Sequence, residues 1–385
     1  MKFTFCLVFL NVVLGLDVIS YNSYDLDPDE YKLELAQVLF RHGERTPREQ
    51  EIYKNDPYQM AYSKIGYGVL TNSGKERMFQ LGYYLRELYS DFIGKNETEK
   101  VLAYHTGWNR TEASLRLVLA GLFPSINLIF ATEEKHRSSL TLHNDSLNFL
   151  RAGLVGKCSS QYLGMIEQNL NKIVKELKDK DFKNFDIKLV ANLTGVPPTP
   201  LAMVWLSPNL KATGRLGFPK PEWCSKVDCS YIEKFSKLFV KCMGSNDWMK
   251  RITGGVLLQR FLKNMETRDN DEKRLHLYSA HDIQLMALVQ TLGLENAPEL
   301  PDYGSCIRIE KLRKKDGRLY VRMIMRTGEQ IPRTIPLKLL GCNVYCPLEI
   351  FAASVRPYFP SEGDWNCPKS SSKDVNIDSY SLSRN

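Results

Sequence analysis

The chain lacks the sequence patterns that make a metal site or a nucleic-acid interface. Its 385 residues include nine cysteines and six histidines, but no Cys-x-x-Cys pair occurs and the histidines do not cluster with cysteines, so a zinc site is not predicted. The net charge of +8 is spread along the chain without a concentrated basic stripe, which argues against binding to nucleic acid. What this charge supports is a mild attraction to anionic partners.

Long hydrophobic runs are also missing beyond the first residues. No later stretch reaches the ~18 apolar residues that a membrane-spanning helix needs, and residues 370–385 are too polar for a membrane anchor or a lipid-attachment signal. At the start, Lys2 precedes an apolar run over residues 3–16, and Gly15 and Ser20 offer cleavage points. This pattern is typical of a secretory signal peptide, which we place at residues 1–20, and it predicts a secreted protein without a membrane anchor.

The number of cysteines is consistent with a protein that folds in an oxidising compartment. Removing Cys6 with the signal peptide leaves eight cysteines, an even number that permits four disulfides. Cys342 and Cys346 are close enough in sequence to close a small loop. Three Asn-x-Ser/Thr sequences are expected to accept glycans, at Asn96, Asn144 and Asn192.

One short stretch combines a buried strand with cationic side chains. The apolar residues 38–40 predict a strand end, and Gly43 permits a sharp turn directly after it. Open α/β sheets bind their ligands at the carboxyl ends of the strands. Arg41 and Arg45 can form paired, charge-assisted hydrogen bonds to a phosphoryl group, and His42 can act as a nucleophile or general base. The stretch therefore predicts an anion site with a nucleophile in it.

Two further strands end in a comparable way. Residues 275–280 alternate like a strand that ends at His281 and Asp282, and residues 101–104 form a short buried strand that leads to Arg110. An apolar helix follows each of them. We therefore predict an α/β fold, with a mainly parallel central sheet flanked by helices and with polar side chains at one edge of that sheet.

The character of the chain changes between residues 133 and 250, where helical patterns dominate. Six prolines between positions 197 and 221 predict a turn-rich connection there, and residues 48–64 predict a long loop over the site. The expected parts are a discontinuous α/β domain at 30–132 and 251–367, a helical insertion or cap at 133–250, and a polar tail at 368–385.

These motifs resemble those of the histidine acid phosphatase family, which includes prostatic, lysosomal and insect venom acid phosphatases and phytases. The pattern Arg-His-Gly-x-Arg-x-Pro matches at residues 41–47, and Tyr-Ser-x-His-Asp matches at residues 278–282. The resemblance covers residues 33–367 and is greatest to the secreted and venom enzymes of insects. It implies the phosphoglycerate-mutase-like form of the α/β fold.

The resemblance also implies two disulfides, and the sequence departs from the family pattern at residues 104–107. Cys158 would pair with Cys367, and Cys306 would pair with one of three partners, Cys224, Cys229 or Cys242. Relatives often carry an Arg-Ser-Thr-Asp type run before the arginine at position 110, whereas residues 104–107 are Tyr-His-Thr-Gly here. A glycan on Asn109 would crowd the mouth of the pocket, so we expect that acceptor to stay unmodified.

The activity implied by the resemblance is hydrolysis of phosphate monoesters. His42 would attack phosphorus and form a phosphohistidine, while Asp282 would protonate the departing oxygen and then help to activate water. Four side chains would hold the phosphate oxygens: Arg41, Arg45, Arg110 and His281. No cofactor or metal is implied. The expected partners are small phosphomonoesters. The sequence does not determine whether the protein forms a homodimer.

Two alternative functions remain open from the sequence. One is a specialised relative, such as a phytase or a lipid-phosphate phosphatase; no basic cluster of the kind that a phytase needs lies beside Arg48. The other is a catalytically weak secreted binding or effector protein with the same fold, for example in venom or saliva. Intact His42 and Asp282 argue against this second alternative.

Overall fold

The computed structural model describes residues 29–94, 97–124, 142–144, 158–178, 180–267, 273–294 and 296–368. The expected signal peptide, Asn96 and nearly all of the expected polar tail lie outside the described residues, as does the side chain of Asn144. Asn192 is described, and it is exposed. No helix in the described ranges is long and apolar enough to cross a membrane.

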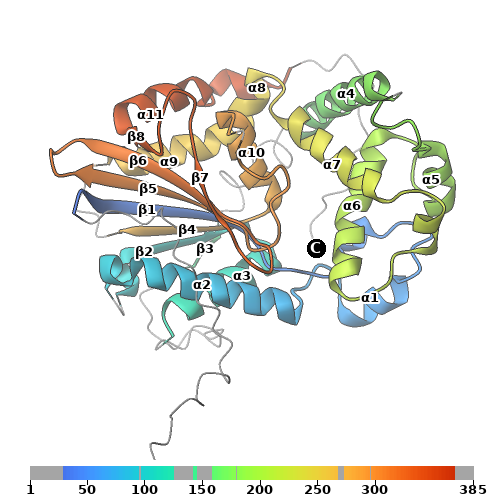
Figure 1. Ribbon diagram of the computed structural model, residues 1–385, viewed down its shortest axis with the longest axis horizontal. Helices are drawn as coiled ribbons and strands as arrows, with labels where there is room; N and C mark the ends of the chain where they lie inside the picture. The colour runs from blue at the N-terminus through green and yellow to red at the C-terminus, as the bar shows by residue number, and fades with distance from the viewer. Residues whose placement is uncertain are drawn as a thin grey trace, which may run out of the picture.

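The described strands form one mixed sheet, in the order β3-β2-β4-β1-β5-β6-β7 with β8 paired to β6 (Figure 1). The first four strands of this order pair in parallel, and the remaining pairings are antiparallel. The strands are β1 (Tyr31–Arg41), β2 (Val101–His105), β3 (Leu142–Asn144), β4 (Leu275–Ala280), β5 (Cys306–Lys314), β6 (Leu319–Arg326), β7 (Thr334–Leu337) and β8 (Tyr345–Pro347). The predicted α/β fold is confirmed, with the antiparallel half lying beyond β1.

Helices cover both faces of this sheet. On one face, α2 (Asn72–Ile93) and α3 (Asn109–Leu122) pack on apolar side chains of β1, β2 and β4. On the other face lie α9 (Val256–Glu266), α10 (Asp282–Leu292) and α11 (Leu348–Val355) (Figure 1). Thr71 caps the start of α2, because its side chain accepts a hydrogen bond from the Gly74 N–H at 3.0 Å. Burial of these apolar faces provides the main stabilisation of the sheet.

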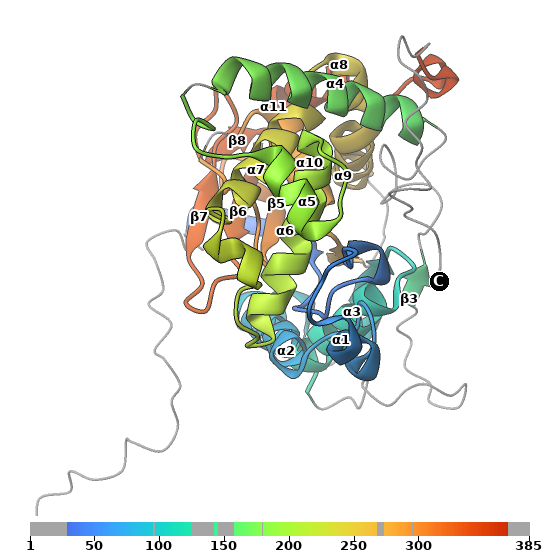
Figure 2. The same ribbon diagram turned by 90° about the vertical axis from the view of Figure 1, so that its right-hand side faces the viewer.

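A second group of helices lies beside the end of the sheet where β1 finishes (Figures 1 and 2). It shares a separate apolar core whose members include Tyr53 from the segment after β1 and Met286 from α10. The helices that contribute to this core are α4 (Ser159–Leu177), α5 (Ile187–Thr194), α6 (Pro200–Arg215), α7 (Ser230–Met243) and α8 (Asp247–Lys250). The short helix α1 (Gln59–Ile65) joins the group through a buried hydrogen bond of 2.7 Å between the Tyr62 and Thr213 hydroxyls. A π-helical turn, η4 (Arg251–Gly255), connects α8 to α9.

Two connections differ from their predictions. The turn-rich connection predicted over 197–221 contains the sixteen-residue helix α6. Thr199 caps this helix and Pro200 occupies its first turn, where a proline loses no hydrogen bond, while Pro208 is tolerated within it. The loop predicted over 48–64 contains the short helix η1 (Glu49–Glu51) and most of α1. In both segments, proline and charged residues led to a prediction of turns or loops, although packing against neighbouring elements stabilises helices there.

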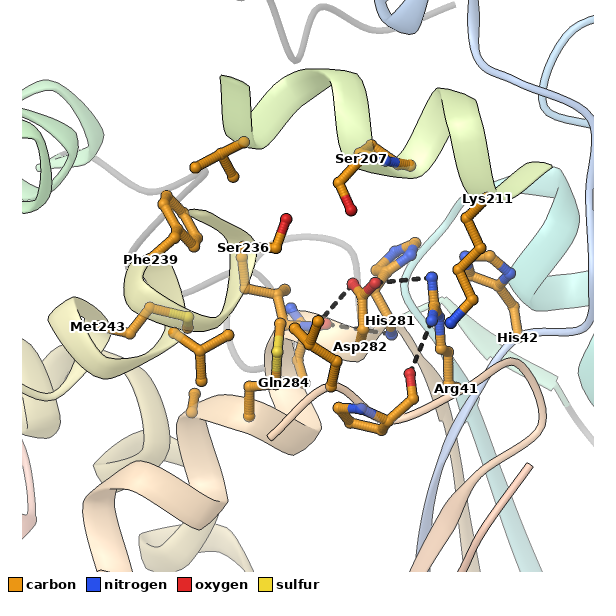
Figure 3. A pocket seen from close by; sticks show the side chains of 18 of the residues that line it. Arg41, His42, Ser207, Lys211, Ser236, Phe239, Met243, His281, Asp282 and Gln284 are labelled. Atoms are coloured by element: carbon orange, nitrogen blue, oxygen red, sulfur yellow. Dashed lines mark hydrogen bonds and ion pairs between the residues drawn. The ribbon is translucent and has the colours of Figure 1, made fainter. Parts of the chain in front are cut away.

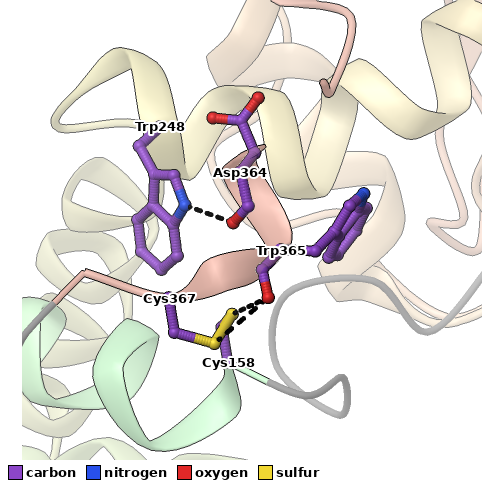
Figure 4. Close-up of a disulfide and its surroundings, with 5 residues drawn as sticks. All are labelled: Cys158, Trp248, Asp364, Trp365 and Cys367. Carbon is purple, nitrogen blue, oxygen red and sulfur yellow. Dashed lines mark hydrogen bonds between the residues drawn. A yellow bond between two sulfur atoms is a disulfide. The ribbon is translucent and has the colours of Figure 1, made fainter. Parts of the chain in front are cut away.

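The structure contains three disulfides among its described residues: Cys158–Cys367, Cys342–Cys346 and Cys224–Cys229. The first joins the start of α4 to the segment beyond residue 361, where Trp248 Nε1 donates to the Asp364 carbonyl oxygen at 2.9 Å (Figure 4). It thereby ties the group of helices beside the sheet to the C-terminal part of the chain.

The pairing predicted for Cys306 is wrong. Cys224 and Cys229 join each other, with their Cα atoms 5.3 Å apart, and Cys242 and Cys306 are both free and buried. Cys306 lies in the core between the sheet and α2, whereas Cys242 lies in the core of the helical group, so the two thiols cannot meet. Burial raises the pKa of both thiols, which keeps them protonated and unreactive.

Candidate active site

The ends of two adjacent parallel strands bring the two sequence motifs together. In the register of β1 and β4, Arg41 lies opposite Ala280, and the backbone N–H of His42 donates to the Ala280 carbonyl at 3.0 Å. The rings of His42 and His281 are consequently 5.3 Å apart, centroid to centroid. The expectation that these side chains meet at the carboxyl edge of the sheet therefore agrees with the observed geometry.

The backbone around His42 determines which ring nitrogen carries the proton. A carbonyl oxygen only accepts hydrogen bonds, so the 2.8 Å contact to the Gly43 oxygen requires a proton on Nδ1 and leaves Nε2 with a free lone pair. Gly43 is required here because a Cβ would lie 2.5 Å from the Gly74 carbonyl oxygen. Burial, followed by the positive charge of Arg110, lowers the pKa of His42 well below its usual value. This shift favours the neutral imidazole.

Three buried arginines surround this imidazole. Arg41, Arg45 and Arg110 are all less than 10% exposed. The Nε atom of each is buried without a hydrogen-bond partner in the part of the chain that the structure describes. Unpaired buried donors are unfavourable in a folded protein. A phosphate group offers the acceptors that such donors need, so the cluster has the chemistry of an oxyanion site.

Glu51 is a site residue that the sequence reasoning missed. Its buried carboxylate accepts two hydrogen bonds from Arg45, both at 2.7 Å, and one from Arg48 Nε, also at 2.7 Å. Burial alone would raise the pKa of Glu51, but the charges of Arg45 and Arg48 outweigh it and lower the pKa below its usual range. Glu51 therefore holds both guanidiniums in place, although it lies in a segment that we predicted to be a loop.

A chain of hydroxyl groups orients His281. A guanidinium only donates hydrogen bonds, so His281 Nδ1, which lies 3.4 Å from an Arg110 nitrogen, is an acceptor and Nε2 carries the proton. Nε2 then donates to the Thr106 hydroxyl at 2.9 Å. The Thr106 hydroxyl donates to Thr111 Oγ1 at 3.0 Å, and Thr111 donates to the Trp108 carbonyl oxygen at 2.8 Å. The departure at residues 104–107 thus places a buried threonine behind His281.

Replacing Thr106 with valine is expected to lower kcat/KM for p-nitrophenyl phosphate by about tenfold, because the isosteric side chain leaves His281 Nε2–H without its acceptor. Thr106→Ser keeps a hydroxyl and is expected to retain most of the activity. Steady-state kinetics on both variants tests this prediction, and urea unfolding compares their stability. Equal activity of the valine variant and the wild type would show that the hydroxyl chain does not orient His281.

Asp282 lies at the first position of α10, beside Arg41. One carboxylate oxygen forms an ion pair with an Arg41 nitrogen at 2.7 Å, and the other accepts the Ile283 N–H at 2.9 Å. Arg41 also donates to the Pro301 carbonyl at 2.7 Å and lies 4.0 Å from the centroid of the Tyr303 ring. The Asp282 side chain is 38% exposed, and it faces the pocket.

A pocket of about 210 Å³ is lined by Arg41, His42, Arg45, Arg110, His281 and Asp282, among others. Figure 3 shows Arg41 and His42 at one end, Phe239 and Met243 at the other, and Asp282 between them. The wall opposite the sheet comes from α6 and α7. Among the residues that the structure describes, no group of three or more His, Cys, Asp or Glu side chains is arranged to hold a metal ion.

Residues 32–326 match the sequence profile of the histidine phosphatase superfamily (branch 2). The chain belongs to this family. Both motifs and all the site residues named above lie within the matched region. The family resemblance inferred from the sequence is confirmed.

Individual relatives of this histidine phosphatase are acid phosphatases. Venom acid phosphatase Acph-1 of Apis mellifera is 29% identical over 364 residues, which cover 88% of each chain. The lysosomal acid phosphatase of Bos taurus is 30% identical over 86% of this chain and 79% of its own. The prostatic acid phosphatase of Rattus norvegicus is 29% identical over 94% and 97%, respectively. The chain is therefore an acid phosphatase, an enzyme that hydrolyses phosphate monoesters.

The fold of this histidine phosphatase is shared with solved structures. The apo form of Hafnia alvei phytase superposes with a TM-score of 0.65, over 89% of this chain and 100% of that chain. Sequence identity between the two is 16%. This likeness establishes a common architecture.

Proposed function

We propose that this acid phosphatase works through a covalent phosphohistidine on His42, with Asp282 as the proton donor. The single observation that carries the proposal is the state of His42. Its Nδ1–H is held by the Gly43 carbonyl, so the lone pair of Nε2 is available among cationic side chains. A neutral imidazole in an anion-binding pocket is the state that a nucleophile toward phosphorus needs.

In the first step, the Nε2 lone pair forms a bond to phosphorus as the ester P–O bond breaks. The departing oxygen takes a proton from the carboxylic acid of Asp282. In the second step, a water molecule attacks the phosphohistidine, gives its proton to the Asp282 carboxylate and releases phosphate, which restores His42.

The arginines stabilise the charge that develops on the transferring oxygens. Arg41, Arg45 and Arg110 hold buried, unpartnered Nε–H groups within the described residues, and the His281 ring lies 5.3 Å from that of His42. A phosphate bound to Arg41 would replace Asp282 as the acceptor of its hydrogen bond. Binding of the substrate would then release the Asp282 carboxyl for proton transfer.

The domain organisation and destination are part of this proposal. We infer that residues 133–250 form a cap over the catalytic domain built from residues 30–132 and 251–367, since α6 and α7 supply a wall of the pocket. The three disulfides suit an oxidising compartment. The signal-like start of the sequence and the venom and lysosomal relatives support secretion of the enzyme.

Rapid-quench experiments with labelled substrates test this proposal, with chelator present throughout. The wild type is expected to hydrolyse p-nitrophenyl phosphate and to form a phosphoenzyme that is stable in alkali and labile in acid. Asp282→Asn is expected to lower kcat for ethyl phosphate by about 10²- to 10⁴-fold. It should slow phosphoenzyme formation from p-nitrophenyl phosphate far less, because nitrophenolate leaves without help from an acid.

A matched control is Asp316→Asn, since Asp316 lies in the exposed turn between β5 and β6. This variant should behave like the wild type with both substrates. Hydrolysis without a trapped phosphoenzyme would contradict the covalent route. If Asp282→Asn lowers the rates with ethyl phosphate and p-nitrophenyl phosphate equally, Asp282 is not the proton donor to the leaving group.

A further inference from the structure

Beyond Asp282 the pocket continues into an apolar chamber. It is lined by Val204, Trp205, Phe239, Val240, Met243 and Met286. These side chains come from α6, α7 and α10, and Figure 3 shows the chamber at the end of the pocket away from His42. Four of the six are no more than 6% exposed: Val204, Phe239, Val240 and Met243. The pocket is therefore polar at one end and apolar at the other.

The order of groups along the pocket assigns a role to this chamber. In an in-line displacement, the leaving oxygen departs on the side of phosphorus opposite the attacking His42. Asp282, which would protonate that oxygen, lies between the histidine and the chamber (Figure 3). The organic part of the substrate must therefore extend past Asp282, between α6 and α10, into the apolar space.

The chamber contains little that would bind a polar or highly charged alcohol. Among the described residues that line the pocket, the arginines lie at the His42 end. Lys211 lies beside Arg41 in Figure 3 and forms an ion pair with Asp302 at 2.9 Å. Four further polar side chains line the pocket: Ser207, Ser236, Thr253 and Gln284. Thr253 Oγ1 donates to the Met249 carbonyl at 2.7 Å, and Gln284 Oε1 accepts the His281 N–H at 3.1 Å. This set offers too few groups for the hydroxyls of a sugar or the phosphates of an inositol polyphosphate, which would lose water without compensation.

We propose that the preferred substrates are phosphate monoesters of apolar alcohols, whose alkyl or aryl group occupies the chamber. This inference rests on the proposed function, because it takes His42 as the nucleophile and Asp282 as the donor. Burial of apolar surface supplies the binding energy, and the chamber excludes water from the carbon next to the leaving oxygen. Chamber residues are then specificity determinants that need not touch the phosphate.

A series of n-alkyl phosphates from ethyl to hexyl tests the proposal, because these leaving groups have nearly the same intrinsic reactivity. We expect kcat/KM to rise about two- to fourfold for each added methylene until the chamber is full. Glucose 6-phosphate and myo-inositol hexakisphosphate should be poorer substrates than hexyl phosphate. Inhibition constants for hexylphosphonate and benzylphosphonate, each compared with that of ethylphosphonate, show whether the chamber binds an alkyl or an aryl group. This comparison involves no chemical step.

Variants of the chamber provide the matched comparison. Val240→Thr keeps the shape of the side chain but adds a hydroxyl to the chamber, and should lower the hexyl-to-ethyl ratio of kcat/KM about three- to tenfold. Val190→Thr makes the same change in the same apolar core, on α5 and away from the pocket, and should leave that ratio unchanged. Val204→Phe fills space in the chamber and should lower the ratio without introducing a polar group.

The outcomes separate this inference from the function on which it rests. A flat dependence on chain length, or a preference for glucose 6-phosphate, with a phosphoenzyme still formed, would overturn the chamber assignment and leave the phosphohistidine mechanism intact. Absence of turnover with every ester would overturn the proposed function. Even then, inhibitor displacement or calorimetry with the three phosphonates would decide the chamber: equal affinities would refute it, and tighter binding of the hexyl or benzyl compound would support it.

Discussion

Replacing His42 with alanine is expected to lower kcat for p-nitrophenyl phosphate by about 10⁴-fold or more and to abolish the phosphoenzyme. The alanine methyl group cannot form the bond to phosphorus. The buried position of His42 also leaves a water molecule poorly placed to attack in its stead. The arginines remain, so the variant should still bind inorganic phosphate, which calorimetry can measure.

Buried histidines elsewhere in the chain provide the control for His42→Ala. His276 lies on β4 in a polar network with Asn264, and burial lowers its pKa to about 4. His276→Asn should reduce stability, while kcat for each folded molecule stays near that of the wild type. Retention of a trapped phosphoenzyme in His42→Ala would show that another side chain is the nucleophile.

Replacing Glu51 with glutamine is expected to damage both stability and catalysis. The substitution keeps the size of the side chain but leaves Arg45 and Arg48 without their buried counter-charge, which typically destabilises a fold by about 3–5 kcal/mol. Glutamine keeps only one acceptor oxygen, so the two 2.7 Å hydrogen bonds from Arg45 cannot both form, and that guanidinium is freer to rotate away from the phosphate. We expect kcat/KM to fall by about 10²- to 10³-fold, as when one oxyanion donor is removed.

The pH dependence of stability distinguishes this role of Glu51. Its pKa is lower in the folded protein than in the unfolded chain, so its stabilising contribution is present above the unfolded pKa of about 4.3 and is lost as the pH falls below it. The difference in unfolding free energy between wild type and Glu51→Gln should therefore be constant from about pH 5 to 7 and shrink in more acidic solution. Urea unfolding across this range measures it.

An exposed ion pair is the matched control for Glu51. Glu112 pairs with Arg116 one turn along α3, at 2.8 Å, and its side chain is 38% exposed. Glu112→Gln should change stability by less than about 1 kcal/mol. Similar unfolding free energies for Glu51→Gln and the wild type, together with unchanged kcat/KM, would mean that Arg45 is positioned without Glu51.

The central site was predictable because its information is local. Each motif consists of an apolar strand that ends in polar residues, and the carboxyl ends of parallel strands lie at one edge of a sheet. That reasoning was sufficient to bring Arg41, His42 and His281 together. It did not reveal Glu51 or Thr106, because one lies in a segment with no clear periodicity and the other in a run that departs from the family pattern.

The cap shows where sequence reasoning stopped. Six prolines between positions 197 and 221 favoured turns, yet α6 forms there because Pro200 fits the first turn of a helix and buried residues such as Leu201 and Met203 pack into the neighbouring core. The same helix carries Val204 and Trp205. Because the sequence pattern did not predict this helix, it could not predict the apolar chamber either. The wrong pairing of Cys306 has a similar origin, since disulfide partners are set by spatial distance.

By itself, the sequence determined the chemistry of this protein: a histidine and several arginines at strand ends, an aspartate beside them, and an α/β sheet to present them. Those features depend on a few neighbouring residues and on strand geometry. Only the tertiary structure decided the tautomers of His42 and His281, the anchoring of Arg45 by Glu51, and the chamber between α6 and α10. Each of these depends on contacts between segments distant in sequence, whose packing no local pattern specifies.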